Sequence, residues 1–404
     1  MNCRISNKKL NLVNDFGKQP LGNGFLKEEN FRNEYFYKMQ TGFCTESKMF
    51  QLIEQPNPEK MFHENYPFFS STSKNMQNHF CIWAEEILKN LINHNKAFVV
   101  ELGCNDGIFL QYFAQNKIKH LGIEPSKNVA EIAKKKNIKV KTEFFNLRLV
   151  DQIIKESGNA DYFISANVMC HIPNILEVAE GIERLLNRDG ILVFEDPYLG
   201  DVINKTSYDQ IYDEHVFLFS AHSVSFLFEK FGMELIKLEP QNTHGGSMRY
   251  TLGKKNRHKK DFSVNEYLNI EKKNGIENYD RMLDFNKSIL NQKRELNKVL
   301  NELKNKNNNI CGYAATSKST TILNFCEINK KTIDCIFDTT DIKIGKFSPG
   351  VHIPIKNMNE FQKANYKYTV LFAWNHAKEI FSKEVGYKKR GGKWIVFSPE
   401  IQII

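Results

Sequence analysis

One loop of the sequence places glycine and acidic residues where a strand turns into a helix. The run FVVELGCNDGIFLQYF is an apolar strand pattern that reaches Glu101 and then turns through Gly103, Asn105 and Gly107. Glycines there let the backbone approach a ligand closely, at the carboxyl end of a strand where open α/β sheets bind ligands. The spacing E-x-G-x-x-x-G differs from the G-x-G-x-x-G that holds a pyrophosphate. We therefore expect a cationic or hydroxylated ligand here rather than a phosphate.

A second acidic residue, Glu124, ends the next predicted strand at 119–125. A carboxylate at this place can accept both hydroxyls of a ribose, as in nucleoside-binding α/β folds. The two strand ends together predict an S-adenosylmethionine site, with Glu101 and the glycine loop near the methionine portion. Asn105 and Asn167, which follow two of the predicted strands, complete the expected cofactor residues. The alternative is a tight turn whose acids are merely solvated.

A cluster of aromatic, acidic and imidazole side chains follows the last strand of this block. The stretch EDPYLGDVINKTSYDQIYDEHVFLFS contains Tyr212, Glu214 and His215. Histidine suits proton transfer near neutral pH, and an adjacent carboxylate or phenol can orient and tune it. His171 and His244 approach from other predicted loops. Each of these side chains could instead be a packing group with a satisfied polar tip, and we favour function for the cluster as a unit.

The elements that must position these residues alternate between apolar strands and helices. Continuous apolar strands with helices between them are typical of a parallel sheet covered on both faces, and we predict them over 97–103, 119–125, 161–167 and 191–197. A helical pattern precedes them over 73–93, with Thr72 or Ser73 as its cap. Two further strands, over 233–240 and 247–253, suit an antiparallel pair at one sheet edge.

The remaining segments predict three further parts of an α/β protein. Residues 1–72 are broken by glycine and proline, and we expect a small loop-rich domain rather than the start of a sheet. Residues 73–260 would form a Rossmann-like core that binds the cofactor. Residues 261–308 have almost no glycine or proline and read as a connector of two helices. A second alternating block, 309–404, predicts a smaller, open α/β domain.

Composition limits the class of protein. The chain has 404 residues, of which 41% are hydrophobic and 25% charged, the balance of an ordinary globular protein. Its net charge of +9 suits an anionic ligand without implying nucleic-acid binding. No apolar run approaches the ~20 residues that span a bilayer, the N-terminus has no secretory pattern, and eight scattered cysteines are no disulfide scaffold. We expect a cytoplasmic protein without nucleic-acid or membrane partners, and its oligomeric state stays open.

These motifs together resemble the three-domain S-adenosylmethionine-dependent sugar C-methyltransferases, which act on nucleotide-linked keto-deoxysugars. QPLGNGFL and NYPFFSSTS resemble their N-terminal domain; ELGCNDG, NVMCHIP, YDQIYDEH and THGGSMR their core; and GYAATSKSTTILNF, FSPGVHIPI and LFAWNHAKEI their C-terminal domain. The resemblance implies a class I methyltransferase core and a nucleotide-linked sugar held between the central and terminal domains. It implies that His215 removes a C–H proton while Tyr212 and Glu214 position it or stabilise the enolate. Tyr66 and His171 are further active-site candidates.

The chain departs from this family at its N-terminal cysteines. Members usually carry two CxxC pairs that read as a four-thiolate zinc site. Here the corresponding stretches are CRIS, beginning at Cys3, and CTES, beginning at Cys44. Serine is not deprotonated at neutral pH as a thiol can be, so this set makes a poor zinc site. We expect no metal, against the alternative of zinc held by Cys3, Cys44 and a nearby histidine.

Three other functions stay open from the sequence. A sugar O-methyltransferase needs a similar base to deprotonate a hydroxyl. A nicotinamide-dependent nucleotide-sugar oxidoreductase or epimerase would place its cofactor in the C-terminal block, although the chain contains no G-x-G-x-x-G. A non-catalytic protein that binds nucleotide-sugars is suggested by the lost cysteines, and the intact Tyr212, Glu214 and His215 oppose it.

Overall fold

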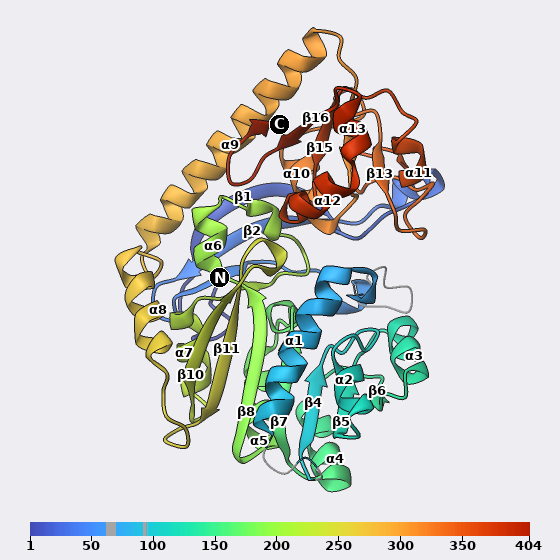
Figure 1. Cartoon of the computed structure of the whole chain (residues 1–404). Coiled ribbons are helices and arrows are strands. Elements are labelled where there is room, and N and C mark those ends of the chain that lie inside the picture. The colour runs from blue at the N-terminus through green and yellow to red at the C-terminus, as the bar shows by residue number, and fades with distance from the viewer. Residues whose placement is uncertain (62–69, 92–93, 95) are drawn as a thin grey trace.

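The computed structural model describes residues 1–61, 70–91, 94 and 96–404, and its largest sheet has seven strands and lies in the lower half of Figure 1. Its strand order is β10-β11-β8-β7-β4-β5-β6, and β11 is antiparallel to both of its neighbours. This order, with the single antiparallel strand next to one edge, is that of a class I methyltransferase core and confirms the expected Rossmann-like fold. The strands are β4 (Phe98–Leu102), β5 (Lys119–Ile123), β6 (Val140–Lys141), β7 (Ala160–Ala166), β8 (Leu186–Pro197), β10 (Met233–Gln241) and β11 (Ser247–Lys254).

Helices cover both faces of this sheet because successive strand residues point to opposite sides. Val99 packs in one apolar cluster while Phe98 and Val100 pack in another. Ser73 caps the first helix as expected, its side chain accepting from the backbone N–H of Met76. The helices of the core are α1 (Lys74–Asn90), α2 (Leu110–Gln115), α3 (Lys127–Lys135), α4 (Leu147–Ser157), α5 (Ile175–Leu185), α6 (Leu199–Asn204) and α7 (Ala221–Glu229).

The N-terminal region contains a sheet, where the sequence led us to expect loops. Three of its four antiparallel strands are β1 (Asn11–Pro20), β2 (Phe36–Cys44) and β3 (Met49–Leu52), and the fourth is β9 (Phe217–Leu218) from the core. Gly17, at φ +71°, lies in an irregularity of β1, and Pro20 is the last residue of that strand. Both are places where a strand tolerates glycine or proline, so these residues shape β1 rather than prevent it.

Two helices, α8 (Phe262–Lys273) and α9 (Tyr279–Asn305), lead to the C-terminal domain, and α9 runs along one side of the molecule (Figure 1). The C-terminal sheet has the order β14-β13-β12-β15-β16-β17, parallel except for β17. Its strands are β12 (Ile310–Tyr313), β13 (Ile336–Asp338), β14 (Ile355–Asn357), β15 (Tyr368–Leu371), β16 (Lys393–Val396) and β17 (Gln402–Ile403), and its helices are α10 (Ser317–Phe325), α11 (Met358–Phe361), α12 (Ala377–Lys383) and α13 (Val385–Lys389). Among the helices of the described residues, none is long and apolar enough to cross a membrane.

Candidate active site

The loop between β4 and α2 requires glycine at two positions. Gly103 has φ +72°, and a Cβ atom there would lie 2.3 Å from Cγ2 of Val168. Gly107 has φ +77°, and its Cβ would lie 2.2 Å from Cδ1 of Ile138. A side chain at either place would combine a left-handed backbone with a steric clash. The loop therefore packs tightly at the carboxyl edge of the sheet, where a ligand would meet its backbone.

Glu124 lies at the end of β5 with its carboxylate held by that same loop. The backbone N–H of Asn105 donates to Oε2 across 3.0 Å, and the N–H of Ser126 donates to Oε1 across 2.8 Å. Burial raises the pKa of Glu124, and these two N–H groups oppose the rise. Each carboxylate oxygen has capacity for a second hydrogen bond, so the carboxylate of Glu124 is held in place with room to accept from hydroxyl groups.

Glu101, at the other strand end, is 3% exposed, and its Oε2 has no hydrogen-bond partner among the described residues. Burial, together with the charge of Glu124, raises its pKa well above the ordinary value. A buried carboxyl oxygen without a partner costs free energy unless a ligand satisfies it. The amino group in the methionine portion of S-adenosylmethionine would satisfy this oxygen beside the glycine loop. Asn167, at φ +55°, follows β7, and its backbone N–H donates to the carbonyl of Glu195 across 2.7 Å.

The 3₁₀ turn η3 (Ser70–Thr72) closes over the cofactor loop. The N–H of Ser70 donates to Oδ1 of Asn105 across 3.1 Å, and the N–H of Ser71 donates to Oδ2 of Asp106 across 3.0 Å. The loop is thereby tied to the segment that leads into α1. Tyr66, which the sequence proposed for the active site, lies outside the described residues.

His215 is held in one tautomer in a buried segment between η5 (Tyr208–Gln210) and β9. Its Nδ1 lies 2.7 Å from the carbonyl oxygen of Gln210, and its Nε2 lies 2.9 Å from the hydroxyl of Tyr212. A carbonyl can only accept, so Nδ1 carries the proton and Nε2 accepts from the phenol. Burial lowers the pKa of His215 well below its usual value. The side chain is therefore neutral at pH 7, and its basic nitrogen, Nε2, accepts a hydrogen bond from Tyr212.

Glu214 and His171 flank this pair. Glu214 is 3% exposed, and its Oε1 accepts from Nδ2 of Asn23 across 2.6 Å, which brings an N-terminal loop to the site. His171, in the turn η4 (Met169–His171), stacks on His215 with ring centroids 5.2 Å apart. Burial lowers the pKa of His171 to about 3. The structure thus brings Tyr212, Glu214, His215 and His171 together, as the sequence predicted.

Two lysines of the C-terminal domain also face this region, and sequence reasoning missed them. Nζ of Lys318, in the first turn of α10, donates to the carbonyl of His244 across 3.2 Å, and its charge acts on His215. Nζ of Lys343 donates to the carbonyl of Ala315 across 2.8 Å, and the charge of Glu214 acts on it. Burial lowers the pKa of both lysines. Only the position of Lys318, at the start of a helix after a strand, could have signalled its role.

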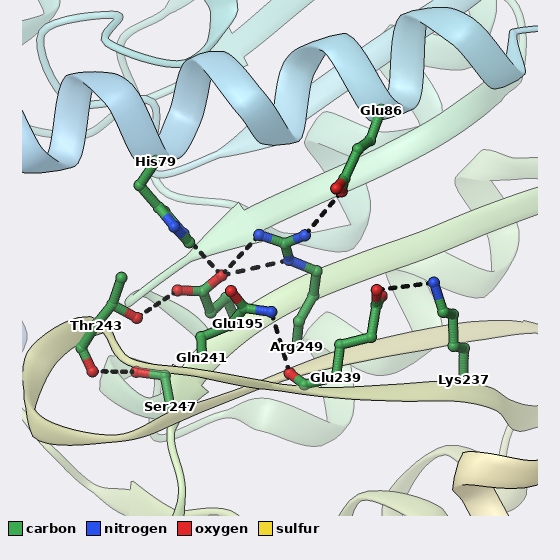
Figure 2. A network of polar contacts seen from close by, with 9 residues as sticks. All are labelled: His79, Glu86, Glu195, Lys237, Glu239, Gln241, Thr243, Ser247 and Arg249. Atoms are coloured by element: carbon green, nitrogen blue, oxygen red, sulfur yellow. Dashed lines mark hydrogen bonds and ion pairs between the residues drawn. The ribbon is translucent and has the colours of Figure 1, made fainter.

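An ion-pair network holds α1 and the turn η6 (Thr243–Gly245) to the sheet (Figure 2). Glu195, on β8, accepts from Thr243 across 2.6 Å, from His79 across 3.0 Å and from the guanidinium of Arg249 across 3.3 Å. Burial raises the pKa of Glu195, but His79 and Arg249 outweigh it and the net pKa is lowered. The guanidinium also lies over the ring of Trp83, 4.1 Å from its centroid. The network therefore ties β8 and β11 to α1 and to the turn η6.

Two cysteines and two serines occupy the four positions that match the zinc ligands of the family, and their side chains form two sulfur–oxygen hydrogen bonds. Sγ of Cys3 lies 3.2 Å from Oγ of Ser47, and Oγ of Ser6 lies 3.3 Å from Sγ of Cys44. No third Cys, His, Asp or Glu of the described residues joins the two cysteines as a group of metal donors. A structural zinc site needs four such donors, so the residues present do not fit zinc, and neither does the alternative site with a histidine.

Three family models and one curated protein match this chain over nearly its whole length. Family models match in order: "Putative zinc binding domain" over residues 3–62, "Methyltransferase domain" over 75–238 and "C-methyltransferase C-terminal domain" over 242–399. The chain is 27% identical to the C-methyltransferase NovU of Streptomyces niveus over 394 residues, which are 97% of this chain and 94% of that protein.

The solved structures named here match less than half of this chain. An S-adenosylmethionine-dependent methyltransferase from Anabaena variabilis is 17% identical, with a TM-score of 0.36, and the match covers 43% of this chain and 84% of that one. Magnesium protoporphyrin IX methyltransferase of Synechocystis PCC 6803, with bound S-adenosylmethionine, is 14% identical, with a TM-score of 0.34. The match covers 44% of this chain and 79% of that one. Three family models lie in sequence along residues 3–399 and a C-methyltransferase aligns over nearly the whole chain, so this chain is an S-adenosylmethionine-dependent methyltransferase that is similar to the three-domain C-methyltransferases.

Proposed function

We propose that this C-methyltransferase acts on a nucleotide-diphosphate keto-deoxysugar, and that His215 removes a proton from the carbon next to the keto group. The observation that carries the proposal is the hydrogen-bonding of His215, whose Nδ1–H is fixed on Gln210 while its unprotonated Nε2 lies 2.9 Å from the Tyr212 hydroxyl. A base must be neutral at the working pH and within reach of its proton. Its lowered pKa keeps His215 neutral.

The reaction needs Tyr212 to exchange one partner for another. When the sugar enters, Nε2 of His215 takes the C–H proton, and the phenol that occupied Nε2 turns to donate to the keto oxygen. A hydrogen bond to that oxygen stabilises the negative charge of the enolate. Bound S-adenosylmethionine supplies, at its sulfonium, the electrophilic methyl group that the enolate carbon takes. The imidazolium of His215 then returns its proton to solvent, and Glu214 stabilises it while charged.

The charge of the site favours a diphosphate. Lys318 and Lys343 reach toward His215 and Glu214 from the C-terminal domain, and burial lowers the pKa of each because a buried ammonium is poorly solvated. An anionic substrate group beside them would compensate both cations. A nucleotide-linked keto-sugar brings two phosphates next to its sugar ring. It would therefore place an anionic group beside the two lysines and an acidic C–H group beside His215.

Methyl transfer to a panel of nucleotide-linked keto-deoxysugars, with mass analysis of the product, tests the proposal. In heavy water without methyl donor, we expect deuterium to enter the sugar carbon, because enolisation by His215 is reversible. His215→Gln should abolish this exchange, while the control His120→Gln, at the opposite end of the sheet, should retain it. A product methylated on oxygen, or exchange that survives in His215→Gln, would refute the proposed chemistry.

A further inference from the structure

A cysteine and two histidines meet beside the proposed base. One ligand atom from each of Cys170, His171 and His215 lies within 4.8 Å of the other two. Within the described part of the chain, this is the one such group of three or more Cys, His, Asp or Glu side chains. Cys170 is fully buried, and His215 is 6% exposed. Three potential metal donors therefore converge in a place largely shielded from water.

The donors are of the kind that zinc and cobalt prefer. A thiolate and two imidazoles suit Zn²⁺ or Co²⁺, whereas Mg²⁺ and Ca²⁺ require oxygen ligands. Three protein donors are also the usual number where a zinc ion keeps one open position.

The surroundings orient one of these donors and fix the backbone of a second. The Nδ1–H of His215 donates to the carbonyl of Gln210, which leaves Nε2 for a metal. The backbone N–H of Cys170 donates to Oδ2 of Asp196 across 3.1 Å. A carbonyl on the far ring nitrogen of a histidine is the outer-shell arrangement that metal-binding histidines use.

We propose that Cys170, His171 and His215 bind a thiophilic divalent cation of the Zn²⁺ type, and that this cation inhibits methyl transfer. Binding forms a bond from the sulfur of Cys170 to the metal and releases the thiol proton to solvent. The lone pair on Nε2 of His215 then bonds to the metal, so it no longer accepts from Tyr212 and cannot take a proton from substrate. The inhibition rests on the proposed function of His215, whereas the binding does not.

Cobalt tests the binding without reference to activity. The full chain, stripped with a chelator, should bind one Co²⁺ and show a thiolate-to-cobalt charge-transfer absorption. Cys170→Ala should lose this absorption, and Cys335→Ala, which removes a buried cysteine of the C-terminal domain, should keep it. An absorption that persists in Cys170→Ala but disappears in Cys3→Ala/Cys44→Ala would assign the metal to the N-terminal domain and overturn the proposal.

Zinc then tests the inhibition. Saturating Zn²⁺ should lower methyl transfer by about 100-fold or more, the contribution of a general base, and a chelator should restore it. Cys170→Ala should retain most of its activity at the same zinc concentration. Equal inhibition of wild type and Cys170→Ala would overturn the proposal. Cobalt bound through Cys170 with undiminished turnover would overturn the inhibition and count against His215 as the base, whereas no cobalt absorption would overturn the metal site alone.

Discussion

The hydroxyl of Tyr212 donates to Nε2 of His215 across 2.9 Å, and the backbone N–H of His215 donates back to the carbonyl of Tyr212 across 3.0 Å. The two residues therefore form a closed turn that sets the phenol against the imidazole. Both side chains are less than a tenth exposed. A substrate that gives its proton to His215 must displace the phenol, because the phenol occupies the only basic nitrogen of the imidazole.

Substitutions in this pair should separate chemistry from cofactor binding. We expect His215→Gln to lower kcat by about 10²- to 10⁴-fold, the range of general base catalysis. Tyr212→Phe should lower kcat less, because the base remains and only the donor to the enolate oxygen is lost. Calorimetry should find S-adenosylmethionine affinity unchanged in both variants and in the control Tyr279→Phe, whose hydroxyl donates to the carbonyl of Leu12. Equal loss of turnover and of cofactor binding in His215→Gln would show that His215 has a structural role.

The glycine loop offers a matched pair of substitutions. Gly103→Ala adds a Cβ 2.3 Å from Val168, whereas Gly158→Ala meets nothing within 4 Å at a similar positive φ of +82°. Gly158, at ψ −175°, lies in a backbone region that is almost restricted to glycine and costs other residues roughly 1–3 kcal/mol, so Gly158→Ala measures a backbone cost without a clash. We expect Gly103→Ala to lower Tm further and to weaken S-adenosylmethionine binding about tenfold or more, a loss of ~1.4 kcal/mol.

Relief of the clash should restore the loop. Gly103→Ala/Val168→Ala should recover much of the lost cofactor affinity, measured by the same titration. If Gly103→Ala and Gly158→Ala bind S-adenosylmethionine equally well, the loop is not the cofactor site.

Local patterns were enough to predict the strands of the core, the cap of α1 and the acids at the strand ends, because each depends on neighbours in the chain. Gly17 and Pro20 were misread, since a strand tolerates them only at an irregularity and an end, and the partner strands that reveal this are distant. Lys318 was missed for the same reason. Its role depends on His215, which comes from a different domain.

The imidazole of His244 should make stability depend on pH. Burial, helped by the charge of Lys318, lowers its pKa from 6.5 to about 3. Between these values the unfolded chain binds a proton that the folded chain does not, so its contribution to stability is lost as pH falls below 6.5. The full shift corresponds to ~2 kcal/mol at pH 5, and partial exposure of the side chain reduces this to about 1 kcal/mol.

His244→Asn removes this group while suiting the left-handed backbone at φ +52°. The Tm difference between wild type and His244→Asn, measured at pH 7.5 and pH 5, should shift in favour of the variant at the lower pH. A difference that does not change with pH would contradict the lowered pKa.

The two carboxylates on Arg249 should differ sharply in their effect on stability. Glu195 has 1% of its side chain exposed and Glu86 has 54%, although each lies near 3 Å from the same guanidinium. Glu195→Gln leaves a buried charge without its partner and should cost about 3–5 kcal/mol, whereas Glu86→Gln should cost less than about 1 kcal/mol. Urea unfolding measures both.

Removal of the buried cation should then recover part of the stability that Glu195→Gln loses. We expect Glu195→Gln/Arg249→Met to be more stable than Glu195→Gln alone, because the uncompensated charge is gone. Similar losses from Glu195→Gln and Glu86→Gln would mean that the network contributes little.

Two serines explain why the N-terminal domain should not need a metal. Ser47 and Ser6 occupy positions where a zinc site would have thiolates, and each forms a hydrogen bond with a cysteine, Cys3 and Cys44 respectively. Ser6→Cys/Ser47→Cys restores four thiolates, and binding of zinc to such a closed site contributes directly to folding. We expect this variant to retain one zinc per chain through chelator dialysis and to melt at a higher temperature, while wild type retains none. If the wild-type chain keeps zinc and Cys3→Ser loses it, the two cysteines are enough to hold the metal.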